Sequence, residues 1–274
     1  MTRPVLDPPA DPAEFAARIR TSVVRMCLAR QRGYVGQGLA LADLLAHLYG
    51  RAMRRGPDGA YRDRFVLSTG HSAIGLFATL GVLGLYEQAE LATYGADGSR
   101  IEESPLEGLP GFEITAGALG QGLSQALGLA LGERMQGRDT TVYCLLSDGE
   151  LQEGQVWEAA MAAGHHRVGN LVVLVDNNRI QADGDTAEVM AVEPVPEKFA
   201  AFGFDALRLD PHDHAALARD LPAGGVPRDR PLALVCQTVP GKGVPSLESH
   251  HKVHYLRAER PVWDRALREL GATP

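Results

Sequence analysis

Three short, unbroken apolar runs most constrain what this chain can fold into. They are "TVYCLL" at 141–146, "LVVLVD" at 171–176 and "LALVCQ" at 232–237, and segments with helical character separate them. Strands that alternate with helices and are apolar on both faces are typical of a parallel sheet covered on both sides. We therefore predict an α/β fold with a mostly parallel, doubly wound sheet and helices on both faces.

Capping residues and apolar spacing indicate the remaining elements. Asp11 followed by Pro12 is typical of a helix start, and Gly50 is typical of a helix end. Residues 95–116 show no period and are expected to be irregular. No repeat or linker is visible, so residues 1–274 are expected to form one domain. Further strands are expected within 63–71 and over 204–209, and helices over 12–31, 39–50, 72–83, 119–135, 153–164, 195–202, 212–220 and from 261.

Charge and cysteine usage exclude some classes of protein. With 27 basic and 34 acidic residues, the formal net charge of −7 argues against a nucleic-acid-binding surface. No apolar run of 18 residues and no signal core occur, so we expect no membrane association and a cytoplasmic location. The three cysteines are widely spaced, and we expect them to be buried free thiols: Cys27, Cys144 and Cys236.

The stretch "LSDGELQEGQ" at 146–155 places three acids after a buried strand, and such acids are costly to desolvate unless a charge compensates them. The next strand ends in "DNN" at 176–178. A β-α-β crossover is about 30 residues long, so Asp148 and Asn178 are expected to lie side by side at the carboxyl edge of the sheet. Glu153 begins a helix, and we interpret Glu150 as a solvated turn charge.

The ligands available at this edge favour a hard divalent cation. An aspartate carboxylate and an asparagine carbonyl suit Mg²⁺ or Ca²⁺. Two protein ligands leave most of the coordination sphere open, which is typical of Mg²⁺ held jointly with the phosphate oxygens of a ligand. The sequence has no GxxxxGK[ST] motif, so the pattern favours a diphosphate bound through its metal rather than a P-loop. The alternative is that both segments are only turns after strands.

Four segments resemble those of transketolases, which depend on thiamine diphosphate. "SDGELQEGQVWEAAMAAGHHRVGNLVVLVDNNRI" (147–180) is similar to the GDG and paired-asparagine pattern of thiamine-diphosphate enzymes, and its "LQEG" is similar to the transketolase insert. The other three segments resemble, in this order, the family's S-x-GH strand and helix, its GPLGQG segment and its closing loop with a functional histidine. They are "FVLSTGHSAIGLFATLGVLG" (65–84), "GFEITAGALGQGLSQALGLALG" (111–132) and "TVPGKGVPSLESHHKVHY" (238–255).

The resemblance implies a role for each matching position. The Mg²⁺ ligands would be Asp148, the Asn178 side chain and the Ile180 carbonyl. The diphosphate would contact the Gly149 amide and the imidazoles of His71 and His254. The catalytic residues would be His71, His254 and Glu153. Gly117 and Leu119 would line the cofactor's rings. Glu153 would belong to a carboxylate network at a subunit interface. Without the resemblance, His71 is a helix-start residue and His254 one of three histidines in a loop.

The resemblance also implies that a partner is needed. In this superfamily the glutamate that activates the cofactor comes from a second, pyrimidine-binding domain. The likeness covers only the diphosphate-binding part. We therefore expect the N-terminal subunit of a split, α2β2 transketolase, inactive alone, which transfers a two-carbon ketol unit from a ketose or ketose phosphate to an aldose acceptor.

Several positions depart from the family pattern. Ser147 replaces the first glycine of GDG, and Ala118 replaces the proline of GPLGQG. Tyr34 and Ser104 stand where histidines facing the sugar are common. These departures predict a sugar other than the ordinary pentose phosphates. The alternatives are a subunit similar to 1-deoxyxylulose-phosphate synthase and a non-catalytic or regulatory thiamine-diphosphate-binding subunit.

Overall fold

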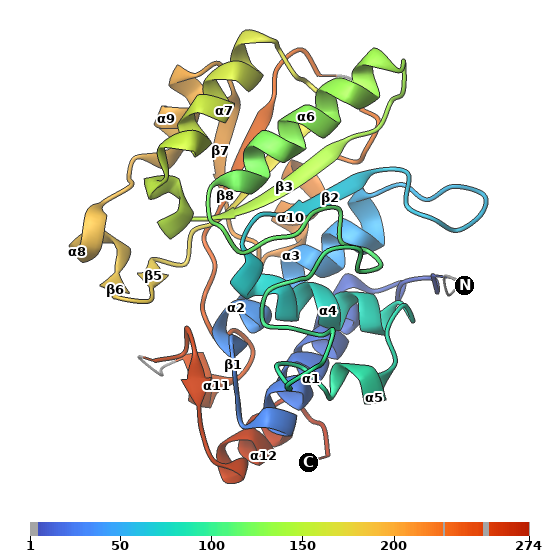
Figure 1. Cartoon of the computed structure of the whole chain (residues 1–274), viewed down its shortest axis with the longest axis vertical. Helices are drawn as coiled ribbons and strands as arrows, with labels where there is room; N and C mark the ends of the chain where they lie inside the picture. Colours follow the sequence, from blue (N-terminus) through green and yellow to red (C-terminus); the bar gives the residue numbers. More distant parts are fainter. Residues whose placement is uncertain (1–4, 227, 249–251, 274) are drawn as a thin grey trace.

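The computed structural model describes residues 5–226, 228–248 and 252–273, and it contains a five-stranded parallel sheet, drawn in the upper half of Figure 1. The spatial order of the strands is β2-β3-β4-β8-β7, and every neighbouring pair is parallel. The predicted sheet is therefore confirmed. Its strands are β2 (Arg64–Leu67), β3 (Val142–Ser147), β4 (Leu171–Asp176), β7 (Asp205–Leu209) and β8 (Leu232–Cys236).

Helices cover both faces of this sheet because successive side chains of each strand point to opposite sides. In β3, Tyr143 and Leu145 enter one apolar core, and Cys144 and Leu146 enter the other. The first core includes residues of α1 (Pro12–Arg30), α3 (Ala42–His47), α4 (Ala73–Val82), α10 (His214–Asp220) and α12 (Arg260–Glu269). The second includes residues of α6 (Gln121–Met135), α7 (Gly154–His165) and α9 (Val195–Ala201).

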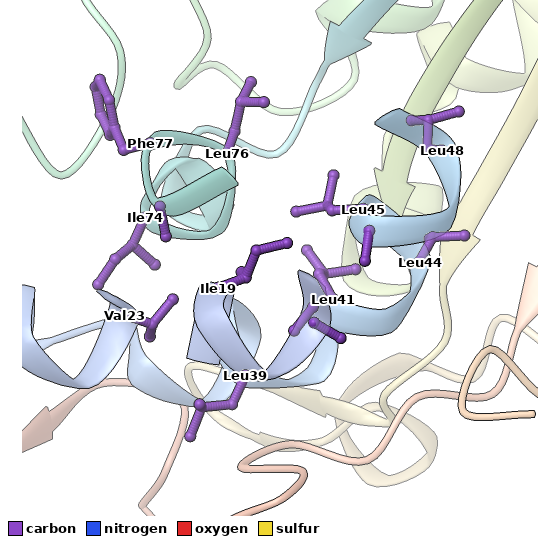
Figure 2. Close-up of a cluster of buried hydrophobic side chains, with 14 of the residues drawn as sticks. Ile19, Val23, Leu39, Leu41, Leu44, Leu45, Leu48, Ile74, Leu76 and Phe77 are labelled. Carbon is purple, nitrogen blue, oxygen red and sulfur yellow. The ribbon is translucent and has the colours of Figure 1, made fainter. Parts of the chain in front are cut away.

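The predicted helix over 39–50 is wrong in its bounds. The structure has α2 (Val35–Ala40), then α3, then the π-helical turn η1 (Leu48–Ala52). The break follows from packing, because residues 35–49 are all buried and contact several elements. Figure 2 shows this core, in which side chains of α1 and α4 meet those of the 39–48 segment. A Cβ atom at Gly38 would lie only 2.8 Å from the Val23 side chain, so α1 and α2 pack closely there.

Several short elements were not predicted, since two to five residues carry little periodic pattern. The pairing of β1 (Arg32–Gly33) with β9 (Leu256–Arg257) joins segments more than 200 residues apart. It places residues 34 and 254–255 next to each other, which matters for the site described below. The other short elements are β5 (Ile180–Gln181), β6 (Gly184–Asp185), α5 (Gln88–Leu91), α8 (Thr186–Met190), α11 (Pro245–Glu248), η2 (Gly70–Ser72) and η3 (Gly149–Gln152).

Two further sequence predictions concern the cysteines and the irregular segment. Cys27, Cys144 and Cys236 are buried and unpaired, as predicted. Residues 95–116 form turns and bends without a helix or strand, also as predicted. Within the described ranges, none of the helices combines the length and the apolar character needed to traverse a bilayer.

Candidate active site

Asp148 lies where β3 ends and contacts the end of β4. Its main-chain N–H donates to the Asp176 carbonyl at 3.0 Å, which continues the β3–β4 register by one residue. Its carboxylate accepts from the main-chain N–H groups of Gly149 at 2.8 Å and Arg179 at 2.6 Å, and from the Thr186 hydroxyl at 3.3 Å. The two strand ends that the sequence analysis paired are therefore adjacent.

Asn178 is oriented by its neighbours on the same strand end. Its Nδ2 group donates to Asp176 Oδ2 at 2.9 Å, and its Oδ1 atom accepts from the Ile180 N–H at 2.9 Å. Asp176 also accepts from the hydroxyl of Thr238, which follows β8. The ends of β3, β4 and β8 thus meet around two carboxylates and one amide. Sequence reasoning noted Asp176 as polar but gave it no role.

The two carboxylates at this edge are buried among neutral donors. Asp148 is 1% exposed and Asp176 is fully buried. Burial, together with the neighbouring Asp176, raises the pKa of Asp148 to about 7, and burial also raises the pKa of Asp176. Within the described ranges, their hydrogen-bond donors are main-chain N–H groups, hydroxyls and one amide, none of which is charged. A bound divalent cation would therefore relieve a real electrostatic cost.

The donor set fits a cation that takes oxygen ligands, with help from a bound molecule. The described ranges contain no group of three or more His, Cys, Asp or Glu residues that could hold a metal. The protein oxygens at this edge are carboxylates, one amide and main-chain carbonyls, which suit Mg²⁺ or Ca²⁺ rather than zinc. Such a partial cage agrees with a metal completed by ligand phosphates.

A glycine contact forms the neighbouring wall of the site. Gly70 follows β2, and a Cβ atom there would lie 2.8 Å from the Gly117 nitrogen. Gly117 itself has φ +147°, a backbone conformation that favours glycine. The main chains of two segments thus pack without side chains between them. Leu119 and Gly120 follow and lead into α6, so the 65–84 and 111–132 segments meet at this glycine contact.

His71 and His254 lie together beside Tyr34. The imidazole centroids are 5.4 Å apart, and the Tyr34 ring is 5.6 Å from His71 and 5.7 Å from His254. Burial, together with the adjacent His254, lowers the pKa of His71 to about 4. Burial also lowers the pKa of His254, whose Nδ1 atom hydrogen-bonds to the Gln37 side chain. Both imidazoles are therefore neutral at neutral pH.

His250 and His251, which the sequence analysis grouped with His254, lie outside the described residues.

The two departures from the family pattern that concern the sugar both lie at this site. The Tyr34 ring contacts Tyr255 edge to face with centroids 4.8 Å apart, and the Tyr255 hydroxyl donates to Glu103 at 2.8 Å. Ser104 lies beside Gly117, since a Cβ atom there would be 3.9 Å from the Ser104 Cβ. Tyr34 therefore lies against both histidines, and Ser104 lies at the Gly117 side of the glycine contact.

The interpretation of Glu150 as a solvated turn charge is wrong. Its side chain is fully buried, because the 3-10 turn η3 folds it back toward the ends of β2 and β3. Its carboxylate accepts from the Ser68 hydroxyl, from the Gly120 N–H at 2.6 Å and from the Ser147 N–H at 3.2 Å. By contrast, Glu153 is exposed at the start of α7. The sequence feature that could have indicated a buried partner for Glu150 was the polar Ser68 at the end of an apolar strand.

Parallel α/β proteins bind their ligands beyond the carboxyl ends of the strands, and the polar residues above lie at that edge. Fold and strand ends thus define a parallel α/β protein whose polar edge has the composition of a site for a small ligand and a cation. A family model described as "Transketolase, thiamine diphosphate binding domain" matches residues 13–259. The chain therefore belongs to the transketolase family.

Individual relatives agree with this assignment. A transketolase family protein of Sinorhizobium fredii is 43% identical, over 94% of this chain and 95% of that protein. A protein of Phocaeicola vulgatus, named as one of the subunits of an apulose-4-phosphate transketolase, is 34% identical, over 92% of this chain and 91% of its own length. The solved transketolase from Leishmania mexicana superposes with a TM-score of 0.87 at 29% identity, covering 97% of this chain but only 42% of that one.

Proposed function

We propose that this chain is the N-terminal, cofactor-binding subunit of a split transketolase, and that it forms a single domain. The observation that best supports this proposal is how much of each relative's length the chain covers. The chain matches a protein named as one subunit of a transketolase over most of both lengths, yet spans about two fifths of the transketolase from Leishmania mexicana. The activity would be transfer of a two-carbon ketol unit from a ketose or ketose phosphate to an aldose acceptor.

The cofactor in this proposal is thiamine diphosphate with Mg²⁺, or with Ca²⁺ in its place. The metal would be held by the Asp148 carboxylate, the Asn178 side chain and the Ile180 carbonyl. This assignment is supported by the two buried carboxylates at the strand ends, whose pKa values are raised. The Gly149 amide would bind the diphosphate, and Gly117 and Leu119 would line the rings. When bound, thiamine diphosphate supplies the electron sink for cleavage of the ketose carbon–carbon bond.

The chain's own contribution would be binding and orientation. His71 and His254 are neutral, so each imidazole presents one N–H donor to a diphosphate or sugar oxygen without adding a charge. Gly70 and Gly117 let the main chain approach the ligand closely.

The sugar in this proposal differs from the ordinary pentose phosphates. Tyr34 and Ser104 lie at the site where the family commonly has histidines. Replacing two imidazoles with a phenol and a short hydroxyl changes both the shape and the donors that meet the sugar. The name of the Phocaeicola vulgatus relative, which refers to apulose 4-phosphate, supports an unusual sugar substrate.

The partner in this proposal is a C-terminal subunit that carries the pyrimidine-binding domain, in an α2β2 assembly. Glu153 is exposed at the start of α7, where that subunit could cover it.

The test is reconstitution with the product of the neighbouring gene. Each chain is purified separately, and ketol transfer is assayed for each alone and for the mixture, with Mg²⁺ and thiamine diphosphate. We expect activity only in the mixture. Full activity from this chain alone would refute the split-enzyme proposal. A mixture that binds the cofactor yet transfers no ketol unit from any of several ketoses would instead favour a non-catalytic subunit.

A further inference from the structure

Three segments that surround the candidate site meet at the carboxylate of Glu150. Ser68 follows β2, Gly120 precedes α6, and Ser147 ends β3. All three donate to this one carboxylate, and Ser68 Oγ in turn accepts from the Gly122 N–H at 3.0 Å. Two main-chain N–H groups at the start of α6 therefore depend on Glu150, one directly and one through Ser68.

The contact of Glu150 with Gly120 fixes the α6 end of the loop of residues 117–120. Gly120 has φ +83°, and a Cβ atom there would lie 2.8 Å from the Glu153 Cβ, so the loop packs tightly on the start of α7. The Leu119 carbonyl accepts from the Gln155 side chain at 3.2 Å. Gly117, at the other end of the loop, packs against Gly70. Each buried main-chain N–H group of such a loop needs a hydrogen-bond acceptor. Glu150 accepts the hydrogen bond from the N–H group of Gly120.

Glu150 also belongs to the turn that carries the metal and diphosphate residues of the proposed site. It lies two residues after Asp148 and directly after Gly149, in η3. The N–H of Glu150 donates to the Ser147 hydroxyl at 3.3 Å, and the N–H of Glu153 donates to the Glu150 carbonyl at 3.0 Å. Both its main chain and its side chain are thus fixed.

We infer that Glu150 is a positioning residue that sets the distance between the 117–120 loop and the turn bearing Asp148 and Gly149. The loop would line the rings of the cofactor and the turn would bind its diphosphate, so Glu150 would match the site to the length of the ligand. The identity of that ligand rests on the proposed function, whereas the hydrogen bonds of Glu150 do not.

Asp63 offers a matched control at the opposite end of the same two strands. Asp63 is 2% exposed and lies directly before β2, whereas Ser68 lies directly after β2. Its carboxylate accepts from the N–H groups of Arg54 at 2.8 Å and Thr141 at 2.9 Å and pairs with the Arg54 guanidinium. Asp63 and Glu150 therefore perform the same structural task on β2 and β3, but only Glu150 contacts the 117–120 loop.

The test compares Glu150→Gln with Asp63→Asn in the full-length chain. Each change replaces one carboxylate oxygen by an NH₂ group that faces a donor, so both variants should lower the melting temperature. Hydrogen exchange of peptides covering 117–122 is measured on the ligand-free chain. Calorimetry then measures binding of thiamine diphosphate with Mg²⁺ to the chain mixed with its partner. Ser68→Ala is a milder third variant, which serves if Glu150→Gln does not fold.

We expect Glu150→Gln to speed exchange in 117–122 by about tenfold and to weaken cofactor binding by about tenfold. Asp63→Asn should change neither. Unchanged loop exchange in Glu150→Gln, or an equal acceleration in Asp63→Asn, would overturn the positioning role. If the loop responds as expected but the wild-type pair does not bind thiamine diphosphate, the positioning role stands and the proposed function fails.

Discussion

The carboxylate of Asp148, after β3, accepts a hydrogen bond of 2.6 Å from the main-chain N–H of Arg179, after β4. Although Arg179 carries a guanidinium, the donor here is its main chain, so the aspartate is solvated by dipoles and not by a cation. With Asp176 fully buried nearby, the strand ends hold more negative charge than the surrounding side chains compensate. This excess charge gives the first prediction.

Asp148→Asn should abolish cofactor binding but change the stability of the ligand-free chain by no more than about 1 kcal/mol. Removing a buried charge is stabilising, whereas the new NH₂ group faces the N–H of Gly149 or of Arg179, and the two effects oppose each other. Loss of the charged ligand should weaken binding of Mg²⁺ with thiamine diphosphate by about 100-fold or more. Urea unfolding and calorimetry measure the two effects. Asp185→Asn, at the exposed N-cap of α8, is the control and should leave binding unchanged. Retained affinity in Asp148→Asn would contradict the assigned metal site.

Tyr34→His should move substrate preference toward ordinary sugar phosphates. The phenol lies 5.6 Å from the His71 ring, centroid to centroid, and the smaller imidazole would open space and replace the phenol O–H by an N–H donor where the family commonly has one. We expect kcat/KM for xylulose 5-phosphate to rise by about tenfold, since matching one substrate hydroxyl is worth at least that much. The measurement uses the reconstituted pair, with Tyr255→Phe as a control that keeps the aromatic packing. If the kcat/KM for xylulose 5-phosphate relative to that for other sugars did not change, Tyr34 would not set specificity.

The sequence predicted the sheet because burial on both faces leaves a continuous apolar run in β3, β4 and β8. The same reasoning placed Asp148 beside Asn178, since a β-α-β crossover forces adjacent strand ends together. It failed at 39–50, where a buried segment forms α2, α3 and η1 in place of one expected helix. It also missed the β1–β9 pairing, because two-residue strands joined across more than 200 residues have no local pattern.

The errors within the site have a common physical cause. Glu150 reads as a surface acid in a polar stretch, and only the fold shows that a 3-10 turn buries it against Ser68 and Gly120. Asp176 was likewise visible as a polar strand end, but its bond to Thr238 depends on β8 lying next to β4. Single residues were identifiable from type and spacing, whereas their partners required the three-dimensional arrangement.

Acid should destabilise the ligand-free chain partly through His71. Burial and the adjacent His254 lower its pKa to about 4 from 6.5, so the unfolded chain binds the proton more tightly. This contribution to stability is complete above pH 6.5 and is lost as the pH falls toward 4. We expect His71→Gln to reduce the loss between these limits by up to about 3 kcal/mol. Urea unfolding across that range measures it, and His166→Gln, at an exposed position, should keep the wild-type slope. A wild-type slope in His71→Gln would contradict the buried, neutral imidazole.

Asp43→Ala should be strongly destabilising and should loosen the segment that leads to His254. Asp43 is 5% exposed; burial raises its pKa, yet hydrogen bonds from His212 and Arg20 outweigh this and hold the pKa below its usual range. Arg20 also donates to the Lys242 carbonyl at 2.9 Å, and His212 Nε2 accepts from the Val239 N–H at 3.0 Å. Arg20 and His212 therefore anchor the 239–242 loop.

Removing the carboxylate leaves the Arg20 guanidinium buried without a counter-charge, which costs about 3–5 kcal/mol. Glu14→Ala, which breaks an exposed ion pair with Arg18 on the same helix, should cost about 0.5 kcal/mol or less. Urea unfolding of both variants provides the comparison. Because the 239–242 loop precedes His254, Asp43→Ala should also weaken cofactor binding by the reconstituted pair, whereas Glu14→Ala should not. Equal losses of stability in the two variants would mean that the buried pair is no stronger than a surface one, and the loop would then need another anchor.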